Sequence, residues 1–302
     1  MRLLPGTLSI WSTSGTQQIL NHQSKSAVKR FSTCILLRSQ EAKQYTVTQE
    51  VDGIRTICLN DVKKRNALSL GMLKELQQNI YKDSEDLRVI ILTHSGPVFS
   101  AGHDLKELTS KEGRAYHMEV FSTCTAMMSS LQDLPVPVIA SVSGLATAAG
   151  CQLVASCDIA IATEKSAFAT PGVNVGLFCS TPAVAVGRSV PRKVAMEMLF
   201  TGQPITAQEA LLHGLVSRVV PKDQLEDATM KIAKKICETS KSVVALGKRT
   251  FYRQMALDRK QAYNLTEEVM VENLSYTDGQ EGIRAFKEKR KPVWSHDESK
   301  EH

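Results

Sequence analysis

Hydrophobic side chains recur at two different spacings in the first two thirds of the chain. The stretch QYTVTQEVDGIRTICLN (44–60) alternates apolar and polar residues on both sides of Asp52-Gly53, a dipeptide typical of hairpin turns. Three short apolar runs, at 88–94, 137–142 and 158–163, predict buried strands.

Between these strands the spacing becomes helical. Met72, Leu73, Leu76 and Ile80 follow Ser69 at helical intervals, which predicts a helix that Ser69 caps and that reaches about Asp83. A short helix is expected at HDLKEL (103–108), a longer one at 112–132 and another around 149–156. Strands that alternate with helices predict a layered α/β fold through about residue 200.

After residue 200 the sequence becomes mainly helical. TAQEALLHG places Thr206 and Glu209 as a capping box, with Gly214 as a stop. One short strand, LVSRVV, is expected next, and then three helical segments from about 223 to 290, the last opened by Thr277 or Asp278 with Glu281 behind it. We therefore divide the chain into residues 41–200 as an α/β core, 201–295 as a helical region and 296–302 as a disordered tail.

Residues 1–40 have a composition of their own. They hold five Lys or Arg, no Asp or Glu, and many Ser and Thr, which predicts a mitochondrial transit peptide cleaved near residues 31–42 and a matrix protein. A secretory signal would need a compact apolar core after its basic start, and a plain disordered tail is the other alternative. Without this segment 32 basic residues face 31 acidic ones, so the charge makes nucleic-acid binding unlikely.

Cysteine usage and hydropathy exclude further classes. The seven cysteines are scattered with no CxxC pair, so the sequence predicts neither a disulfide framework nor a metal site. No apolar run approaches the roughly 20 residues of a membrane-spanning helix.

Two turns rich in small residues lie between a strand and a helix: FSAGHDL (99–105) and GLATAAGCQL (144–153). Small residues let the backbone approach a ligand, and helix N-termini offer N–H donors. Each turn alone is also explained by strand–helix packing.

Together with KKRNALS, FATPGVNVGLF, GQPITAQEALLHGLVSRVVP and DGQEGIRAFKEKRKPVW, these turns resemble the crotonase (enoyl-CoA hydratase/isomerase) superfamily over about residues 45–294. The resemblance implies an α/β spiral of ββα units, a C-terminal helical region that mediates trimerisation, and an acyl-CoA thioester as ligand or substrate. It implies no permanently bound cofactor and a homotrimer or hexamer.

The resemblance also assigns residues. The backbone N–H groups of His103 and Ala149 correspond to the oxyanion hole, which would stabilise an enolate formed at the thioester oxygen. The positions that match the CoA- and substrate-binding segments are Arg65, Ala67, Leu68, Ala101, His103, Asp104, Leu105, Lys106 and Ala149.

Hydration of an enoyl thioester needs an acid and a base, and the family's hydratases use two glutamates. Those positions correspond to Gln152 and Gly172, and a third acidic position of related enzymes corresponds to Ser180. An amide does not exchange protons at neutral pH. We therefore expect weak or absent hydratase activity and an acyl-CoA-binding role in lipid metabolism.

Two alternatives stay open. The first is an active decarboxylase, thioesterase or residual hydratase that uses Gln152, Ser180, Cys179 or His103; the second is RNA binding, which some family members combine with hydratase activity. His103 is also explained as an ordinary side chain at a helix start, and His117 as a satisfied helical histidine. Lys289, Arg290 and Lys291 are expected to form a solvated helix face, with a phosphate contact in a neighbouring subunit as the lesser alternative.

Overall fold

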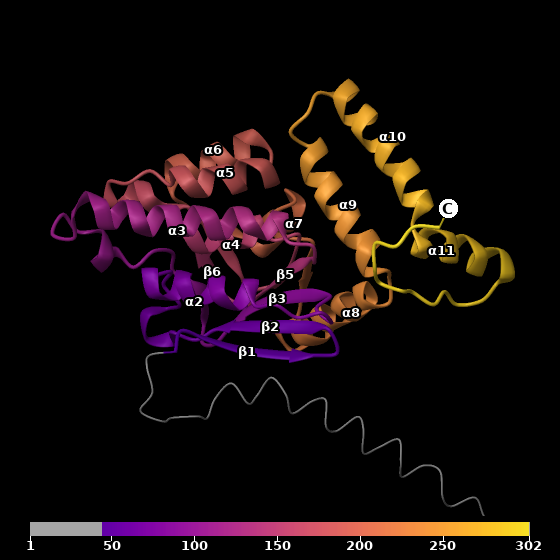
Figure 1. Cartoon of the computed structure of the whole chain (residues 1–302). Coiled ribbons are helices and arrows are strands. Elements are labelled where there is room, and N and C mark those ends of the chain that lie inside the picture. The colour runs from indigo at the N-terminus through magenta and orange to yellow at the C-terminus, as the bar shows by residue number, and fades with distance from the viewer. Residues whose placement is uncertain (1–43, 302) are drawn as a thin grey trace, which may run out of the picture. The chain divides into compact units, whose positions relative to one another are not determined.

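The computed structural model describes residues 44–301, and the expected transit peptide and its cleavage site lie outside this range. Two sheets organise the described chain (Figure 1). The six-stranded sheet has the order β1-β2-β3-β5-β7-β10, with bounds Thr46–Val51, Ile54–Leu59, Val89–His94, Val138–Val142, Ile159–Thr163 and Arg218–Val220. The four-stranded sheet has the order β4-β6-β8-β9, with bounds Val98–Ser100, Leu145–Thr147, Ala167–Ala169 and Ile205–Thr206.

A ββα unit repeats along the chain and explains both sheets. Each unit gives a long strand to the first sheet, a short strand to the second and then a helix: β3, β4 and α3 (Gly113–Asp133), β5, β6 and α4 (Ala149–Ser156), β7, β8 and α5 (Ser180–Ser189). Neighbouring strands of successive units are parallel. This is the spiral that the sequence motifs implied, although the strands of the second sheet are too short to show a hydrophobic period.

The predicted strands and helices of the first half have the bounds expected within a few residues. β1 and β2 pair antiparallel around Asp52-Gly53, and Ser69 accepts a hydrogen bond from Met72 N at the start of α2 (Leu70–Tyr81). The segment at HDLKEL is a 3₁₀ helix, η3 (Leu105–Leu108), rather than an α-helix.

Alternate residues of β3 bury against different layers, as the two-residue period of a strand requires. Ile90 and Leu92 belong to the main core with α2, α3 and α4. Val89 and Ile91 pack instead with Leu225 and Ala233 of α8 (Leu225–Cys237). Both faces of the central strand are therefore covered, which is why the run at 88–94 is continuously apolar.

Residue 200, where the sequence changes character, lies inside the two-sheet structure. β9 pairs with β8, and β10 pairs with β7, so each sheet takes its last strand from beyond that residue. The remaining elements are η4 (Pro171–Val175), α6 (Arg192–Thr201), α7 (Ala207–Leu212), α9 (Lys241–Gln254), α10 (Arg259–Ser275) and α11 (Thr277–Glu288), with short 3₁₀ turns η2 (Val62–Lys64) and η5 (Lys222–Gln224). The Thr206–Glu209 capping box opens α7 as expected.

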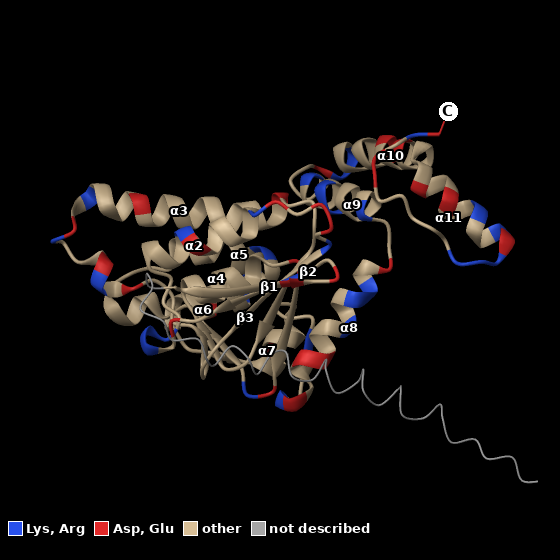
Figure 2. Cartoon of the chain, turned by 60° about the horizontal axis from the view of Figure 1, so that its bottom comes forward, with Lys and Arg blue, Asp and Glu red and all other residues tan. Residues whose placement is uncertain are grey.

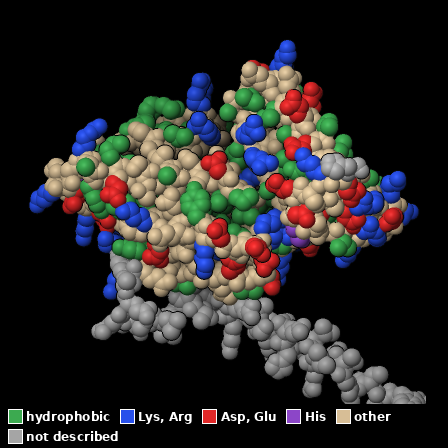
Figure 3. Space-filling view, viewed as in Figure 1, with side chains coloured by type: hydrophobic (Ala, Val, Ile, Leu, Met, Phe, Trp, Pro, Cys, Tyr) green, Lys and Arg blue, Asp and Glu red, His purple; other side chains and the backbone are tan. Residues whose placement is uncertain are grey.

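The expectation of three helices after residue 223 was wrong, because α8 to α11 are four. Asp258 caps α10 by accepting from the backbone N–H groups of Lys260 and Gln261, which separates α10 from α9. Figure 2 shows both charge signs along α8 and α11. Hydrophobic side chains are also visible among the charged ones over the C-terminal helices (Figure 3).

α9 is anchored to the two-sheet core by a buried ion pair. Lys248 Nζ lies 2.7 Å from Asp158 Oδ2 and donates to the carbonyls of Leu131 and Val136 at 2.6 and 2.9 Å. Tyr252 donates from its hydroxyl to the other carboxylate oxygen of Asp158 at 2.8 Å. Every charge of this anchor therefore has a partner.

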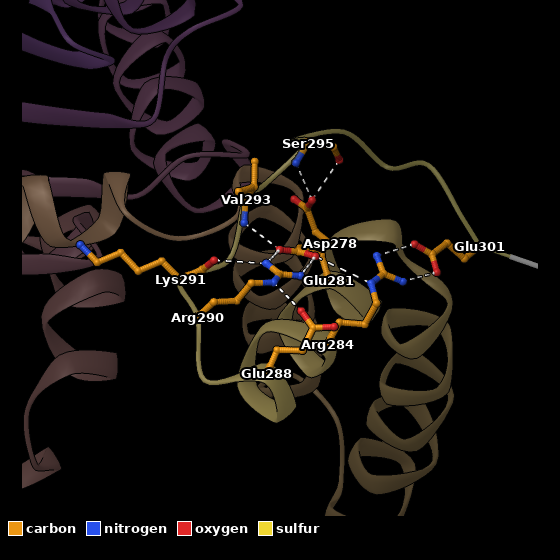
Figure 4. A network of polar contacts seen from close by, with 9 residues as sticks. All are labelled: Asp278, Glu281, Arg284, Glu288, Arg290, Lys291, Val293, Ser295 and Glu301. Atoms are coloured by element: carbon orange, nitrogen blue, oxygen red, sulfur yellow. Dashed lines mark hydrogen bonds and ion pairs between the residues drawn. The ribbon is translucent and has the colours of Figure 1, made fainter.

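The start of α11 and the chain end also differ from expectation. Neither Thr277 nor Asp278 caps the helix; Asp278 accepts from Ser295 N at 2.6 Å and from His296 N at 3.1 Å, while Glu281 pairs with Arg290 (Figure 4). Residues 296–301 are not a disordered tail: backbone bonds join Thr277 N to the Ser299 carbonyl and Glu301 N to the Ser275 carbonyl.

The basic run at 289–291 is a charged turn rather than a helix face. Lys289 ends α11 with a left-handed conformation, φ 54°, and Arg290 bonds Glu281 through two nitrogens, at 2.5 and 2.9 Å. We call Asp278, Glu281, Arg290, Val293 and Ser295 the C-terminal clasp.

None of the described helices is long and apolar enough to cross a bilayer.

Candidate functional site

The two small-residue turns lie against each other. Gly102 has a φ of +81°, and a Cβ built on it would lie 2.8 Å from Ala148 Cβ and 3.3 Å from Ala149 N. Only glycine allows this approach. It brings the residue before His103 next to Ala149, so the two backbone donors that the sequence motifs suggested belong to one place.

The N–H groups around these donors are used within the fold. Ala101 N donates to the Arg65 carbonyl at 3.0 Å, Gly102 N to Ser100 Oγ at 3.2 Å, and Ala148 N to the Ala169 carbonyl at 2.9 Å. The hydrogen bonds of residues 44–301 include none from the N–H of His103 or of Ala149. Two donors that the fold itself does not use therefore remain for a ligand.

The second donor opens α4, where the helix adds to the attraction of an anion. Ala149 is the first residue of α4, and helix N-termini carry partial positive charge. Ala148, just before it, has φ 49° and ψ −118°, a rare conformation for a residue with a Cβ. Such backbone strain is concentrated at functional sites.

A second loop is fixed to the first donor turn and carries the other residues assigned to CoA. The Leu68 N–H donates to the Gly102 carbonyl at 2.7 Å, and Lys64 Nζ lies 2.5 Å from Asp104 Oδ2. Burial acts to raise the pKa of Asp104, but the hydrogen bond and charge of Lys64 outweigh it and hold that pKa below its usual range. This pairing fixes the two loops in one arrangement.

The assigned residues differ in what they can offer a ligand. The side chains of Arg65, Leu105 and Lys106 are exposed, whereas those of Ala67 and Leu68 are buried. The structure thus brings the two assigned segments together, with three accessible side chains, two buried apolar ones, and Asp104 engaged by Lys64.

The His103 ring is held in one orientation. Its Nδ1 lies 3.1 Å from the Leu68 carbonyl, which only accepts, so Nδ1 carries the proton. The ring packs edge-on against Phe121 of α3, with 5.0 Å between centroids. Burial lowers the pKa of His103, with a smaller opposing effect from the Leu68 carbonyl. The imidazole is neutral, and its buried Nε2 has no hydrogen-bond partner among the described residues.

None of the three positions that the motifs match to the family's acids carries a group with proton-transfer chemistry. Gln152 is 5% exposed, and its Oε1 has no partner within residues 44–301. Ser180 is exposed at the start of α5 and donates only weakly, at 3.4 Å, to the Phe178 carbonyl. A buried polar atom without a partner needs an explanation, and a ligand or water at Gln152 supplies one.

Cys179 is a structural thiol rather than an improvised nucleophile. Gly172 N donates to its Sγ at 3.3 Å, and burial raises the pKa of the thiol, partly offset by that bond. A thiolate is the reactive form, so a raised pKa argues against this role. His117, outside the site, is half-buried, and its Nε2 lies 3.0 Å from the Thr109 carbonyl, so this helical histidine has a partner.

The motifs did not identify Ser100 or Phe121. Ser100 is part of the quoted turn, but its role depends on a hydroxyl that reaches a loop 34 residues away. Phe121 reaches His103 from α3, a long-range contact for which the sequence contains no signal. Lys64, in contrast, stands directly before the assigned Arg65 and could have been included.

Comparisons with known proteins identify the family of the chain. The family model for enoyl-CoA hydratase/isomerase matches residues 49–297. The chain is 64% identical over 260 residues to the mouse "Enoyl-CoA hydratase domain-containing protein 3, mitochondrial", covering 85% of this chain and 87% of that protein.

Two solved structures have the same fold. The crystal structure of human enoyl-CoA hydratase domain-containing protein 3 matches with a TM-score of 0.82 and 64% identity, over 83% of this chain and 100% of that one. The crystal structure of a Mycobacterium smegmatis enoyl-CoA hydratase matches with a TM-score of 0.81 and 44% identity, over 83% and 99%. The expected crotonase fold is confirmed.

Proposed function

Because the chain belongs to the enoyl-CoA hydratase/isomerase family, we propose that it binds acyl-CoA thioesters in mitochondrial lipid metabolism and has weak or no hydratase activity. The mouse relative is named mitochondrial, and the acid-free, basic first 40 residues support the same location, in the matrix. Coenzyme A is then part of the ligand rather than a resident cofactor.

The observation that carries the proposal is the meeting of two unused N–H groups. Gly102 packs against Ala148 and Ala149, and neither His103 N nor Ala149 N has a partner in the described chain. A thioester oxygen is an acceptor that gains negative charge when the carbonyl is polarised, and two backbone donors suit it.

The same site supports binding better than hydration. Hydration requires one group to take a proton from water and another to protonate the α-carbon. Gln152 can orient a water through its amide but cannot deprotonate it, and Gly172 has no side chain. The N–H donors stabilise charge without moving protons.

Calorimetric titration of the full chain with butyryl-, crotonyl- and octanoyl-CoA tests the proposal. We expect dissociation constants in the micromolar range, roughly −8 kcal/mol. A thioether analogue, in which a methylene replaces the carbonyl, should bind more weakly because it offers no oxygen to the donors. Absence of heat with every thioester would overturn the proposal.

One observation favours a second candidate, an active acyl-CoA enzyme. Nε2 of His103 presents a buried lone pair next to an oxyanion donor, and a neutral imidazole can accept a proton. Release of free thiol from acyl-CoA, or of CO₂ from an acyl-CoA that carries a carboxylate on its α-carbon, would support it if His103→Gln abolished the reaction. RNA binding gains no such support, since lysines and acidic residues are mixed on the face shown in Figure 3.

A homotrimer or hexamer is the assembly we propose. Several large apolar side chains of the C-terminal helices and the following segment are well exposed in the single chain: Tyr263, Met270, Val271, Phe286 and Val293. Monomers rarely leave such groups uncovered in number. Sedimentation of the full chain measures the assembly directly, and a monomer at micromolar concentration would contradict this part of the proposal.

A further inference from the structure

Ser100 lies between the two donor turns. Its hydroxyl makes one hydrogen bond to the loop at 65–68 and one within the first donor turn. The side chain is fully buried at the end of β4. Its Oγ donates to the Asn66 carbonyl at 2.8 Å and accepts from Gly102 N at 3.2 Å. One hydroxyl therefore joins the loop at 65–68 to the residue before His103.

Ser100 also lies against the second donor turn. A Cβ built on Gly150 would meet the Ser100 carbonyl oxygen at 2.6 Å, its Cβ at 2.7 Å and its Oγ at 2.9 Å. Gly150 follows Ala149 directly, so Ser100 is packed within contact of residues adjacent to both donors.

An irregularity in β4 accounts for the position of this side chain. Val98 pairs with Leu145 and Ser100 with Ala146, so two residues of β4 advance while β6 advances one. Bulges of this kind re-aim side chains next to active sites. Phe99 and Ser100, next to this irregularity, are both fully buried.

Asn66 holds the other end of this connection. It has a left-handed backbone, φ 51°, and its Nδ2 donates to the carbonyls of Ser95 and Val98 at 3.0 and 2.8 Å. Its own carbonyl, which accepts from Ser100, is thereby fixed relative to the strand. The Asn66–Ser100–Gly102 connection ends one residue before the His103 donor.

We propose that Ser100 is a positioning residue that sets the distance between the His103 and Ala149 N–H groups through its hydroxyl, and so determines how strongly the site polarises a thioester carbonyl. This rests on the proposed acyl-CoA binding and adds to it the residue that tunes it. Ser100 does not itself touch the ligand.

The test compares the affinity for a thioester with that for its thioether analogue, and it measures the infrared stretch of the bound thioester carbonyl. In the full chain, Ser100→Ala should reduce the preference for butyryl-CoA over its thioether analogue by about tenfold, because a small misplacement of a positioned donor is costly. Affinity for the thioether should stay unchanged. The infrared stretch of a ¹³C-labelled bound thioester should move back toward its frequency in water, which loss of general stability would not cause.

Ser130→Ala is the matched control, because Ser130 is also a buried serine whose hydroxyl donates to one carbonyl, that of Met127 at 2.7 Å. It should leave the preference and the infrared band unchanged. If Ser100→Ala fails to fold, Ser100→Cys decides, since it keeps the shape and weakens the hydrogen bonds; its preference should fall at least about threefold.

The outcomes separate the two proposals. A wild-type chain that binds neither analogue would overturn the proposed function. A wild-type chain that prefers the thioester, with the preference and the band retained in a folded Ser100→Ala or Ser100→Cys variant, would overturn the role of Ser100 alone.

Discussion

The candidate functional site and the C-terminal clasp differ in how their polar atoms are paired. In the site, the N–H groups of His103 and Ala149, Nε2 of His103 and Oε1 of Gln152 have no partners among the described residues. In the clasp, Glu281 accepts from two nitrogens of Arg290 and from Val293 N (Figure 4). Leaving buried polar groups unpaired costs free energy. The unpaired atoms of the site are therefore those expected of a ligand-binding site, whereas the paired atoms of the clasp stabilise the fold.

The largest effect that we predict concerns the candidate site and is measured as hydratase activity. Each missing acid or base is worth about 10²–10⁴-fold, so we expect wild-type hydration of crotonyl-CoA at least about 10⁴-fold below that of an enzyme with both glutamates. Restoring them with Gln152→Glu and Gly172→Glu together should raise hydration by about 10²-fold, and each single change far less. Loss of the enoyl-thioester absorbance measures the rate.

The recovery should stay incomplete for a steric reason. Gly172 does not have a positive φ, so its backbone conformation does not restrict a side chain; instead a Cβ there would lie 2.8 Å from the Leu177 carbonyl and 2.9 Å from Cys179 Sγ. The turn must shift before a glutamate fits. Wild-type turnover of about 10 s⁻¹ or more would show that another acid–base pair operates.

The buried anchor of α9 should give the largest change in stability. Replacing Lys248 by Met leaves Asp158 buried without its counter-charge, which costs about 3–5 kcal/mol. Urea unfolding of the full chain measures it. The matched control is Lys74→Met, because Lys74 Nζ also lies 2.6 Å from a carboxylate, that of Glu119, but both side chains are about half exposed.

Lys74→Met should change the free energy of unfolding by less than about 1 kcal/mol. Equal effects of the two lysine variants would mean that the burial of the Lys248–Asp158 pair does not matter. The Lys248–Asp158 pair would then contribute no more to stability than an exposed ion pair such as Lys74–Glu119.

A third experiment removes one polar side chain from each kind of environment. Gln152→Met deletes an amide whose Oε1 has no partner, so the free energy of unfolding should change by less than about 1 kcal/mol without ligand. Thr229→Val deletes a buried hydroxyl that donates to the Leu225 carbonyl at 2.7 Å and whose oxygen lies 3.2 Å from Ser141 Oγ. It should cost about 1–3 kcal/mol, because Ser141 then lacks that partner.

Thermal melts of the two variants give the comparison. A large destabilisation by Gln152→Met would indicate that the amide is satisfied within the fold, and the argument that it faces a ligand or water would fail.

The sequence predicted the parts of the fold that depend on local pattern. The hairpin at Asp52-Gly53, the Ser69 cap and the Thr206–Glu209 capping box each need only a few neighbouring residues. The strands of the second sheet, each two or three residues long, were missed because they are too short to show a hydrophobic period. The number of helices after residue 223 was underestimated, and caps such as that of Asp258 mark where the fourth helix separates from its neighbour.

The site was predictable only as far as motifs reach. The two small-residue turns were enough to suggest the two backbone donors, and the motifs suggested the positions where the family's acids are replaced. The structure adds that Gly102 allows the two turns to contact each other. The long-range partners could not be predicted, because the contacts of Phe121 with His103 and of Ser100 with Asn66 form only when distant elements pack.

The smallest effect we predict is local and depends on pH. The pKa of Glu281 is lowered from 4.5 to about 2. The hydrogen bonds from Arg290 are the largest cause, and the one from Val293 N is the next. A lowered pKa in the folded state means that the contribution is fully present above pH 4.5 and is lost as the pH falls toward 2. Trp294 reports on this, since its Nε1 donates to the Glu238 carbonyl at 2.9 Å. In a Trp11→Phe background, its emission should shift toward that of exposed tryptophan over this range, and in Glu281→Gln it should already be shifted at pH 7. An emission that responds to acid identically in both chains would show that the Glu281 carboxylate does not hold the segment, and the clasp would then differ from the site in geometry but not in energetic role.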